Sequence, residues 1–153
     1  MIRIKKILLP TDLSEYADYA LPYAVELCTA FAAKLHLVHV VDSHWLTPMS
    51  TADFPGRVAD QMRQIQSAAE VSMGDLKARV QGVEVETAVL LGTPHVEVIR
   101  FARDKEVDLI VLATHGRTGI SHALIGSVAE KIVEMAPCPV LSTKHPEHEF
   151  VLP

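Results

Sequence analysis

The chain has 153 residues, which is the size of one ordinary domain with a substantial core. Hydrophobic residues make up 49% and charged residues 22%, and this composition excludes an intrinsically disordered chain. The formal net charge of -5 argues against unspecific nucleic-acid binding, which depends on clustered Lys and Arg. A small anion is still compatible with this charge, because backbone N–H groups at a helix start bind phosphate without a basic surface.

The first apolar run is interrupted by Pro10 and Asp12, which is not the pattern of a secretory signal. No apolar run has the length of a membrane span. The two cysteines, Cys28 and Cys138, lie in apolar surroundings without C-x-x-C spacing, so we expect a pair of buried, reduced thiols. We therefore expect a cytoplasmic protein whose partners are neither nucleic acid nor membrane.

Short apolar runs alternate with helical patterns from the start of the chain. The first strand is expected in KKILLP and ends at Pro10. One helix should follow, with Ser14 as its N-cap, and Pro22 should bend this helix or loosen one of its turns. The second strand is expected over Leu35–Val41, before a long loop over 43–57 that has two prolines and no period.

The same alternation continues to the end of the chain. A second helix is expected over 58–80, and VEVETAVLL forms the third strand after Gly82. The next helix should begin with Thr93 as N-cap and Pro94 at its first position. VDLIVLA, residues 107–113, is apolar on both faces, so we expect helices on both sides of this fourth strand.

After the fourth strand, the segment ATHGRTGISHALIGS leads into a helix that ends near Met135. The fifth strand is expected in CPVLSTK, residues 138–144. We therefore expect one α/β domain over 1–145, followed by a polar tail over 146–153.

This element order predicts a doubly wound, five-stranded parallel sheet with helices on both faces. Two strand orders, 2-1-3-4-5 and 3-2-1-4-5, are common for such sheets. We adopt 3-2-1-4-5, in which the first strand is central and the switch point lies between strands 1 and 4. Ligands bind beyond the carboxyl ends at a switch point, so PTDLS and ATHGRTG should border one crevice.

The segment Ala113–Ser127 fits neither the P-loop nor the G-x-G-x-x-G pattern. Gly116 would let the backbone approach an anion, and Arg117 adds a positive charge. Gly126 and Ser127 lie where a helix begins, and N–H groups there favour phosphate. The residues alone are equally compatible with a crossover loop in which this pair only caps the helix.

Other polar groups carry weaker signals. Thr11–Ser14 is, on its own, more typical of a helix-capping turn than of a ligand site. His36 and His39 are three residues apart on a strand, so they point to opposite faces and do not share a metal ion. We identify no metal-binding carboxylate with a positioned nucleophile, which efficient phosphoryl transfer normally requires.

The stretches KKILLPTDLSEYADYAL, LVHVVD and LLGTPHVEVIRFARDKEVDLIVLATHGRTGISHALIGSVAEKIVEMAPCPVL resemble the universal stress protein family. The nucleotide-binding branch of that family carries G-x-x-G, nine residues, and then G-[S/T]. Here the pattern reads Ala113-Thr114-His115-Gly116, nine residues, Gly126-Ser127. The spacing is intact and Ala113 replaces the first glycine. Its extra methyl group is compatible with binding where the backbone is ordinary, so we expect binding to be retained.

The resemblance implies ATP or AMP as ligand, with Mg or Mn held through the phosphates. It places Asp12 at the adenosine end, the Val40 backbone at the adenine edge and Ala113 near the ribose. It places the phosphates near Gly116 and the start of the last helix. The residues implied at the nucleotide site are Pro10, Thr11, Asp12, Val40, Ala113, His115, Gly116, Arg117, Gly126, Ser127 and Val128.

The resemblance also implies a stress-response regulatory protein that forms a homodimer through the last strand, Pro139–Thr143. Two alternatives stay open. One is a slow ATPase or autophosphorylating protein, and the other is a dimeric interaction module that binds no nucleotide.

Overall fold

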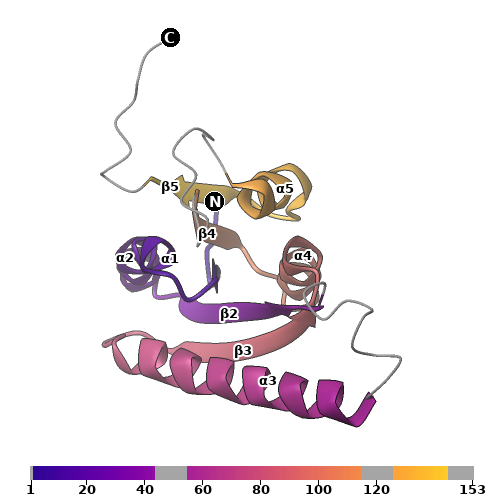
Figure 1. Cartoon of the computed structure of the whole chain (residues 1–153). Helices are drawn as coiled ribbons and strands as arrows, with labels where there is room; N and C mark the ends of the chain where they lie inside the picture. The colour runs from indigo at the N-terminus through magenta and orange to yellow at the C-terminus, as the bar shows by residue number, and fades with distance from the viewer. Residues whose placement is uncertain (1, 44–54, 115–125, 145–153) are drawn as a thin grey trace.

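The computed structural model describes residues 2–43, 55–114 and 126–144. The elements are β1 (Lys6–Thr11), α1 (Glu15–Asp18), α2 (Leu21–Phe31), β2 (Lys34–Asp42), α3 (Pro55–Ala78), β3 (Val85–Gly92), α4 (Pro94–Asp104), β4 (Leu109–Ala113), α5 (Ser127–Met135) and β5 (Val140–Thr143). The five strands form one parallel sheet in the order β3-β2-β1-β4-β5, which confirms the predicted α/β fold (Figure 1). In the described ranges, no helix combines the length and apolar character that a membrane span requires.

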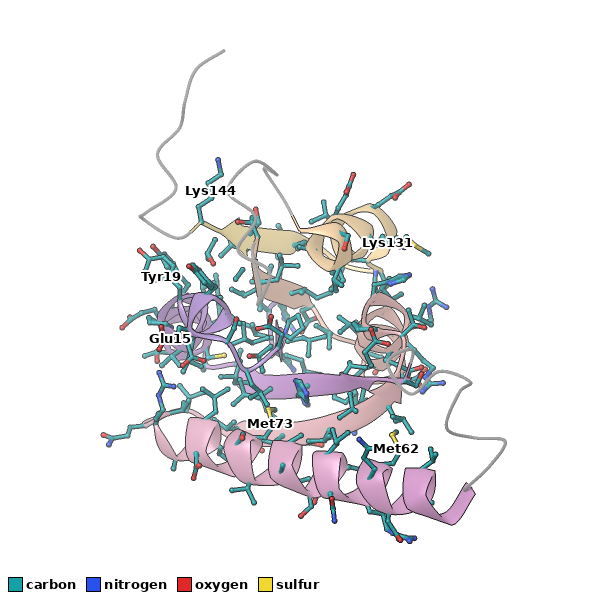
Figure 2. The ribbon with its side chains drawn as sticks, viewed as in Figure 1. Glu15, Tyr19, Met62, Met73, Lys131 and Lys144 are labelled. Atoms are coloured by element: carbon teal, nitrogen blue, oxygen red, sulfur yellow. The ribbon has the colours of Figure 1, made fainter. Side chains whose placement is uncertain are left out.

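The sheet has an apolar core on each face. On one face, α2 and α3 pack against Leu35 and Leu37, and Figure 2 shows Met73 pointing from α3 toward the sheet. On the other face, Val98 of α4 and Ile132 of α5 belong to the second core. The side chains of β4 alternate between these two cores, and Ile110, Val111 and Leu112 are each at most 2% exposed. The expectation that β4 is covered on both faces is therefore confirmed.

Pro10 ends the pairing of β1 with β4. The Lys6 carbonyl accepts from Asp108 N–H at 2.9 Å. The backbone N–H and carbonyl groups of Lys6 and of every second residue after it therefore point toward β4. Pro10 is one of these residues and has no N–H to donate. The registered pairs between the two strands are Ile7↔Leu109 and Leu8↔Ile110, so the ladder stops three residues before each strand ends. On the other side, β1 stays paired with β2 as far as Thr11↔His39.

The helix that we expected to bend at Pro22 is two helices. Ser14 caps α1 as predicted, because its Oγ accepts from Ala17 N–H at 3.2 Å. After α1 the chain makes tight turns, and α2 begins after Ala20 with Pro22 in its first turn. A proline is tolerated there because a first-turn N–H has no partner within the helix. The expected bend is thus a break.

Other boundaries differ from the prediction by a few residues. Strand β1 includes Thr11, one residue beyond Pro10, and α3 begins at Pro55, three residues before the expected start. Thr93 and Pro94 begin α4 as predicted, and α5 begins at Ser127 and ends at Met135. Most of the expected 43–57 loop and the whole 146–153 tail lie outside the described residues, so the division into domain and tail stays a prediction.

Replacement of glycine by alanine should change the free energy of unfolding in opposite directions at Gly92 and at Gly74. Gly92 has φ +146°, and an added Cβ would lie 2.8 Å from Oε1 of buried Glu97, so Gly92→Ala should destabilise the fold by about 1–3 kcal/mol. Gly74 lies inside α3 with no atom within 4 Å of an added Cβ, so Gly74→Ala should stabilise it by about 0.5–1 kcal/mol. Urea unfolding measures both, and effects of the same sign would contradict this account.

Candidate functional site

Thr114 directly follows β4 and fastens the start of α5 to the sheet. Its N–H donates to the Thr143 carbonyl at 3.0 Å, and its hydroxyl donates to the same oxygen at 3.2 Å. Its own carbonyl accepts from Gly126 N–H at 2.6 Å. Because Thr114 is only 2% exposed, these hydrogen bonds are shielded from water. They hold the residue that precedes α5 against the carboxyl ends of β4 and β5.

Gly126 is the N-cap of α5 and has extended backbone angles, φ -68° and ψ 150°. It has no side chain to cap the helix, and an added Cβ would lie only 3.3 Å from the Thr114 carbonyl oxygen. The N–H groups of the following turn have no partner within the helix. Ser127 and Val128 in this turn are exposed, so the positive end of the helix dipole is accessible to an anion.

The turn after β1 is a helix-capping turn, as one of our interpretations predicted. Oδ1 of Asp12 accepts from the Ser14 N–H at 3.0 Å and from the Ser14 hydroxyl at 2.5 Å. Oγ1 of Thr11 accepts from the Leu13 N–H at 3.0 Å. These bonds hold Leu13 at φ +62°, a conformation that costs free energy for a residue with a side chain. A role of Asp12 toward a ligand stays a prediction.

His39 supports this turn from the neighbouring strand. Its Nδ1 lies 2.9 Å from the carbonyl oxygen of Thr11, and the two residues are in register between β1 and β2. Because a carbonyl oxygen only accepts, Nδ1 carries the proton of this hydrogen bond. The side chain is 9% exposed. His39 thus fixes the end of β1. In β2 it directly precedes Val40, whose backbone the family resemblance implies at the adenine edge.

The structure brings most of the predicted site residues to one edge of the sheet. Pro10 and Thr11 end β1 and Asp12 follows it, Ala113 ends β4, and Gly126 caps α5 before its first residues, 127–128. Val40 lies two residues before the end of the adjacent strand β2. The predicted residues His115, Gly116 and Arg117 lie outside the described residues.

Sequence reasoning missed three residues at this edge. In the sequence, Thr114 is only a variable position of the motif, and His39 suggests nothing beyond a metal ligand. Lys144 follows β5 and adds an exposed cation (Figure 2). The signal for Thr114 was its position, since the residue after a buried strand and before a loop has backbone groups that need partners. For the described part of the chain, we find no group of three His, Cys, Asp or Glu side chains that could hold a metal ion.

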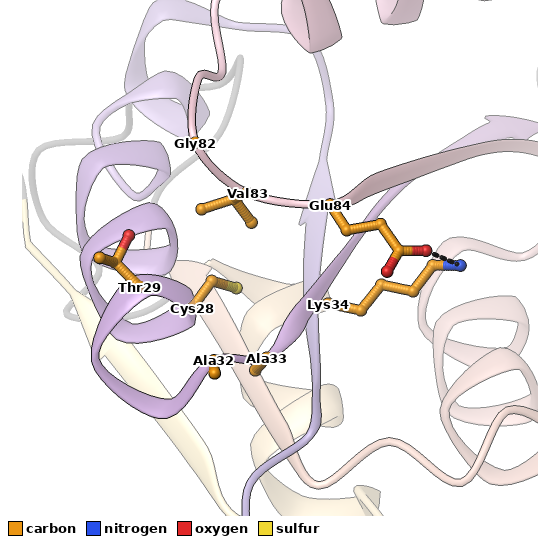
Figure 3. A pocket seen from close by; sticks show the side chains of 8 residues that line it. All are labelled: Cys28, Thr29, Ala32, Ala33, Lys34, Gly82, Val83 and Glu84. Atoms are coloured by element: carbon orange, nitrogen blue, oxygen red, sulfur yellow. Dashed lines mark ion pairs between the residues drawn. The ribbon is translucent and has the colours of Figure 1, made fainter.

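A cavity of about 310 Å³ lies elsewhere, at the amino ends of β2 and β3 (Figure 3). It is lined by Cys28, Thr29, Ala32, Ala33, Lys34, Gly82, Val83 and Glu84. It is therefore separate from the edge where the predicted site residues meet. Burial raises the pKa of the Cys28 thiol to about 11, so this group stays protonated and unreactive at neutral pH. Both cysteines are free, as predicted, but Cys138 is partly exposed and not buried.

The raised pKa of Cys28 predicts slow alkylation of the folded protein. A shift from 9.0 to about 11 lowers the thiolate fraction roughly a hundredfold, so iodoacetamide should react with Cys28 roughly a hundred times more slowly than in urea. Cys138, whose pKa is also raised by burial but whose side chain is partly exposed, serves as the internal comparison. Peptide mass spectrometry gives both rates. Equal rates for Cys28 in the folded and unfolded protein would contradict its burial.

Residues 3–144 of the chain match the universal stress protein family. The chain belongs to this family. The universal stress protein MJ0531 of Methanocaldococcus jannaschii is 33% identical over 147 residues, which cover 95% of this chain and 85% of that protein. The solved structure of MJ0577 from the same organism is 30% identical, with a TM-score of 0.84 and coverage of 94% of this chain and 98% of that chain.

A member of the family with the same fold has been solved with a nucleotide. The universal stress protein from Archaeoglobus fulgidus in complex with dAMP is 20% identical to this chain, with a TM-score of 0.59. The comparison covers 93% of this chain and 98% of that one. At this identity the likeness establishes the shared fold.

Proposed function

We propose that this universal stress protein binds an adenine nucleotide, ATP or AMP, at the carboxyl ends of β1 and β4, and acts as a regulatory module in the stress response. The observation that carries the proposal is the start of α5. Thr114 holds a side-chain-free N-cap, Gly126, at the switch point of the sheet. The intact family spacing between residues 113 and 127 and the dAMP complex of the Archaeoglobus fulgidus protein support an adenine nucleotide as the ligand class.

The phosphates would bind at the first turn of α5. Backbone N–H groups of Ser127 and Val128 would donate to the phosphate oxygens, and the helix dipole favours the negative charge. The Ser127 hydroxyl can add one hydrogen bond. A divalent cation, Mg or Mn, would be held through the phosphate oxygens, which are the ligands that Mg prefers.

The adenosine would lie toward β1 and β2. Asp12 would face the nucleoside and the Val40 backbone would pair with the adenine edge. Ala113 replaces the first glycine of the family pattern at the ribose. It is the last residue of β4 and is not among the residues with positive φ, so its backbone is one that alanine adopts without strain. This supports retention of the site despite the substitution.

Thermal unfolding with ATP or AMP, each with and without magnesium, tests the proposal. A ligand at a hundred times its dissociation constant stabilises the folded state by about 2.7 kcal/mol, which raises the Tm of a domain of this size by roughly 5–10 °C. Gly126→Asp should abolish the rise, because it places a carboxylate where a phosphate would bind. Gly74→Asp, the same change at an exposed glycine of α3, should leave it intact.

The protein should first be freed of copurified nucleotide, and acid extraction followed by chromatography checks this. An unchanged Tm of the nucleotide-free protein at millimolar ligand would contradict the proposal. A rise that survives in Gly126→Asp would place the ligand elsewhere on the molecule.

We also propose that the protein forms a homodimer through β5, over Pro139–Thr143. This strand is an edge of the sheet, and an edge offers unpaired backbone groups to a second copy. Leu141 in this strand is 39% exposed, and Met135 at the end of α5 is 54% exposed, so the region also presents apolar surface.

Leu141→Lys should convert the dimer to a monomer, because it places a charge in the proposed interface. Leu91→Lys is the matched control, since Leu91 is 49% exposed in β3, the opposite edge strand. Size-exclusion chromatography with light scattering at micromolar concentration measures both. A monomeric wild-type protein, or a dimer that both variants leave intact, would contradict the interface.

A further inference from the structure

His36 is a buried histidine in the third position of β2, toward the end of the sheet that lies opposite the candidate nucleotide site. Its side chain is almost fully buried, and neither ring nitrogen has a hydrogen-bond partner among the described residues. Such groups are uncommon in folded proteins because a desolvated ring loses its hydrogen bonds to water without replacement. In the neutral ring, one nitrogen of His36 therefore carries no proton and accepts no hydrogen bond from the described residues.

The surroundings of the ring are one carboxylate and one aromatic side chain. His36 is in register with Glu86 of β3, and Glu86 Oε2 lies 3.7 Å from Nδ1. This separation is too long for a hydrogen bond but short enough for a strong attraction once the ring is charged. On the helix side, Phe101 of α4 meets the ring edge-on, with centroids 5.7 Å apart.

Glu86 is already shared between two cations. Lys34 Nζ lies 2.9 Å from its Oε2, and Lys105 Nζ lies 3.6 Å from its Oε1. Lys105 is the C-cap of α4, and its ammonium group also lies 5.8 Å from the centre of the Phe101 ring. The Glu86 carboxylate thus links the carboxyl end of α4 to β3 through Lys105, in a partly exposed and therefore weak ion pair.

The charges around His36 decide which cation the site accepts. Burial lowers the pKa of His36, and Lys34, Lys105 and Lys6 of β1 act in the same direction, while Glu86 alone opposes them. Three neighbouring ammonium groups disfavour a metal ion. A proton is the cation that the ring nitrogens can still accept, because the positive charge would then be delocalised over a ring beside a carboxylate.

We propose that His36 is a proton-sensitive switch in this fold. When the ring takes up a proton from solvent, both nitrogens carry an N–H and the imidazolium attracts the Glu86 carboxylate. The carboxylate moves from Lys105 toward His36, and the contact that ties the end of α4 to β3 is lost. The proposed switch at His36 involves none of the residues that we propose at the nucleotide site.

The direction of the pH effect follows from the lowered pKa. As the pH falls below about 6.5, the ordinary pKa of histidine, the unfolded chain takes up a proton that the folded protein still resists. The contribution of neutral His36 to stability is therefore complete above that pH. It is lost progressively as the pH falls from the ordinary pKa toward the lower folded one.

NMR titration of the histidine ring signals tests the assignment of charges. The His36 midpoint should lie below that of the urea-unfolded chain. Glu86→Gln should lower it further, by up to roughly one pH unit, and Lys105→Met should raise it. Glu70→Gln, an exposed change on α3 across the sheet, should leave the midpoint unchanged. A midpoint at or above the unfolded value, or one that Glu86→Gln raises, would overturn the proposal.

Hydrogen exchange tests the switch itself. Protection factors of the amides at 103–105 should fall several-fold between about pH 7 and a pH below the His36 midpoint that the NMR titration gives. They should stay constant in His36→Gln, and His36→Leu provides a second variant if the first fails to fold. The same fall in either folded variant, or no fall in a wild-type protein whose His36 is protonated, would show that the ring does not act as a switch.

Discussion

Pro10 has no backbone N–H, and this limits the pairing between the central strand β1 and its neighbour β4. Pro10 faces β4 and cannot continue the ladder, so β1 and β4 remain paired only at Ile7↔Leu109 and Leu8↔Ile110. A proline inside a central strand normally argues against that strand, because it removes a ladder hydrogen bond. Here Pro10 lies in the strand at which the strand order reverses, with β2 on one side of β1 and β4 on the other. The ladder between β1 and β4 thus ends short of the carboxyl ends of both strands, at the switch point of the sheet.

The start of α5 is held in place by Thr114. Thr114 binds β5 through its N–H and hydroxyl and binds Gly126 through its carbonyl, so one buried residue connects a strand end, an edge strand and a helix. The cap has no side chain, and the accessible first turn of the helix suits an anion. His39 stabilises the turn after β1 through its hydrogen bond to the Thr11 carbonyl. The chain belongs to the universal stress protein family, and the geometry at the start of α5 is the basis on which we propose a ligand at this edge.

The sequence predicted the parallel α/β fold and the start of α5, because alternating apolar runs and the Gly126-Ser127 pair are local signals. The alternation is compatible with two common strand orders, and the structure confirms the one that we adopted. It did not predict the break between α1 and α2, since apolar residues keep a helical spacing on both sides of Pro22 and cannot distinguish a bent helix from a new one. Leu13 and Ala32 adopt positive φ without glycine, so no residue type indicated these turns. The hydrogen bonds of Thr114 and the missing partners of His36 depend on residues far away in the sequence, and local patterns carry no information about them.

An amide NMR titration of nucleotide-free protein shows whether the phosphates of a nucleotide bind at the first turn of α5. We expect ATP to shift the amides of Ser127, Val128 and Ala113 strongly, and to leave those of Thr29 and Val83 at the distant cavity unchanged. Adenosine should retain the shifts near Val40 and Ala113 but lose those at the start of α5, because it has no phosphate. Shifts that cluster around Cys28, or an α5 start that responds equally to ATP and adenosine, would contradict the account.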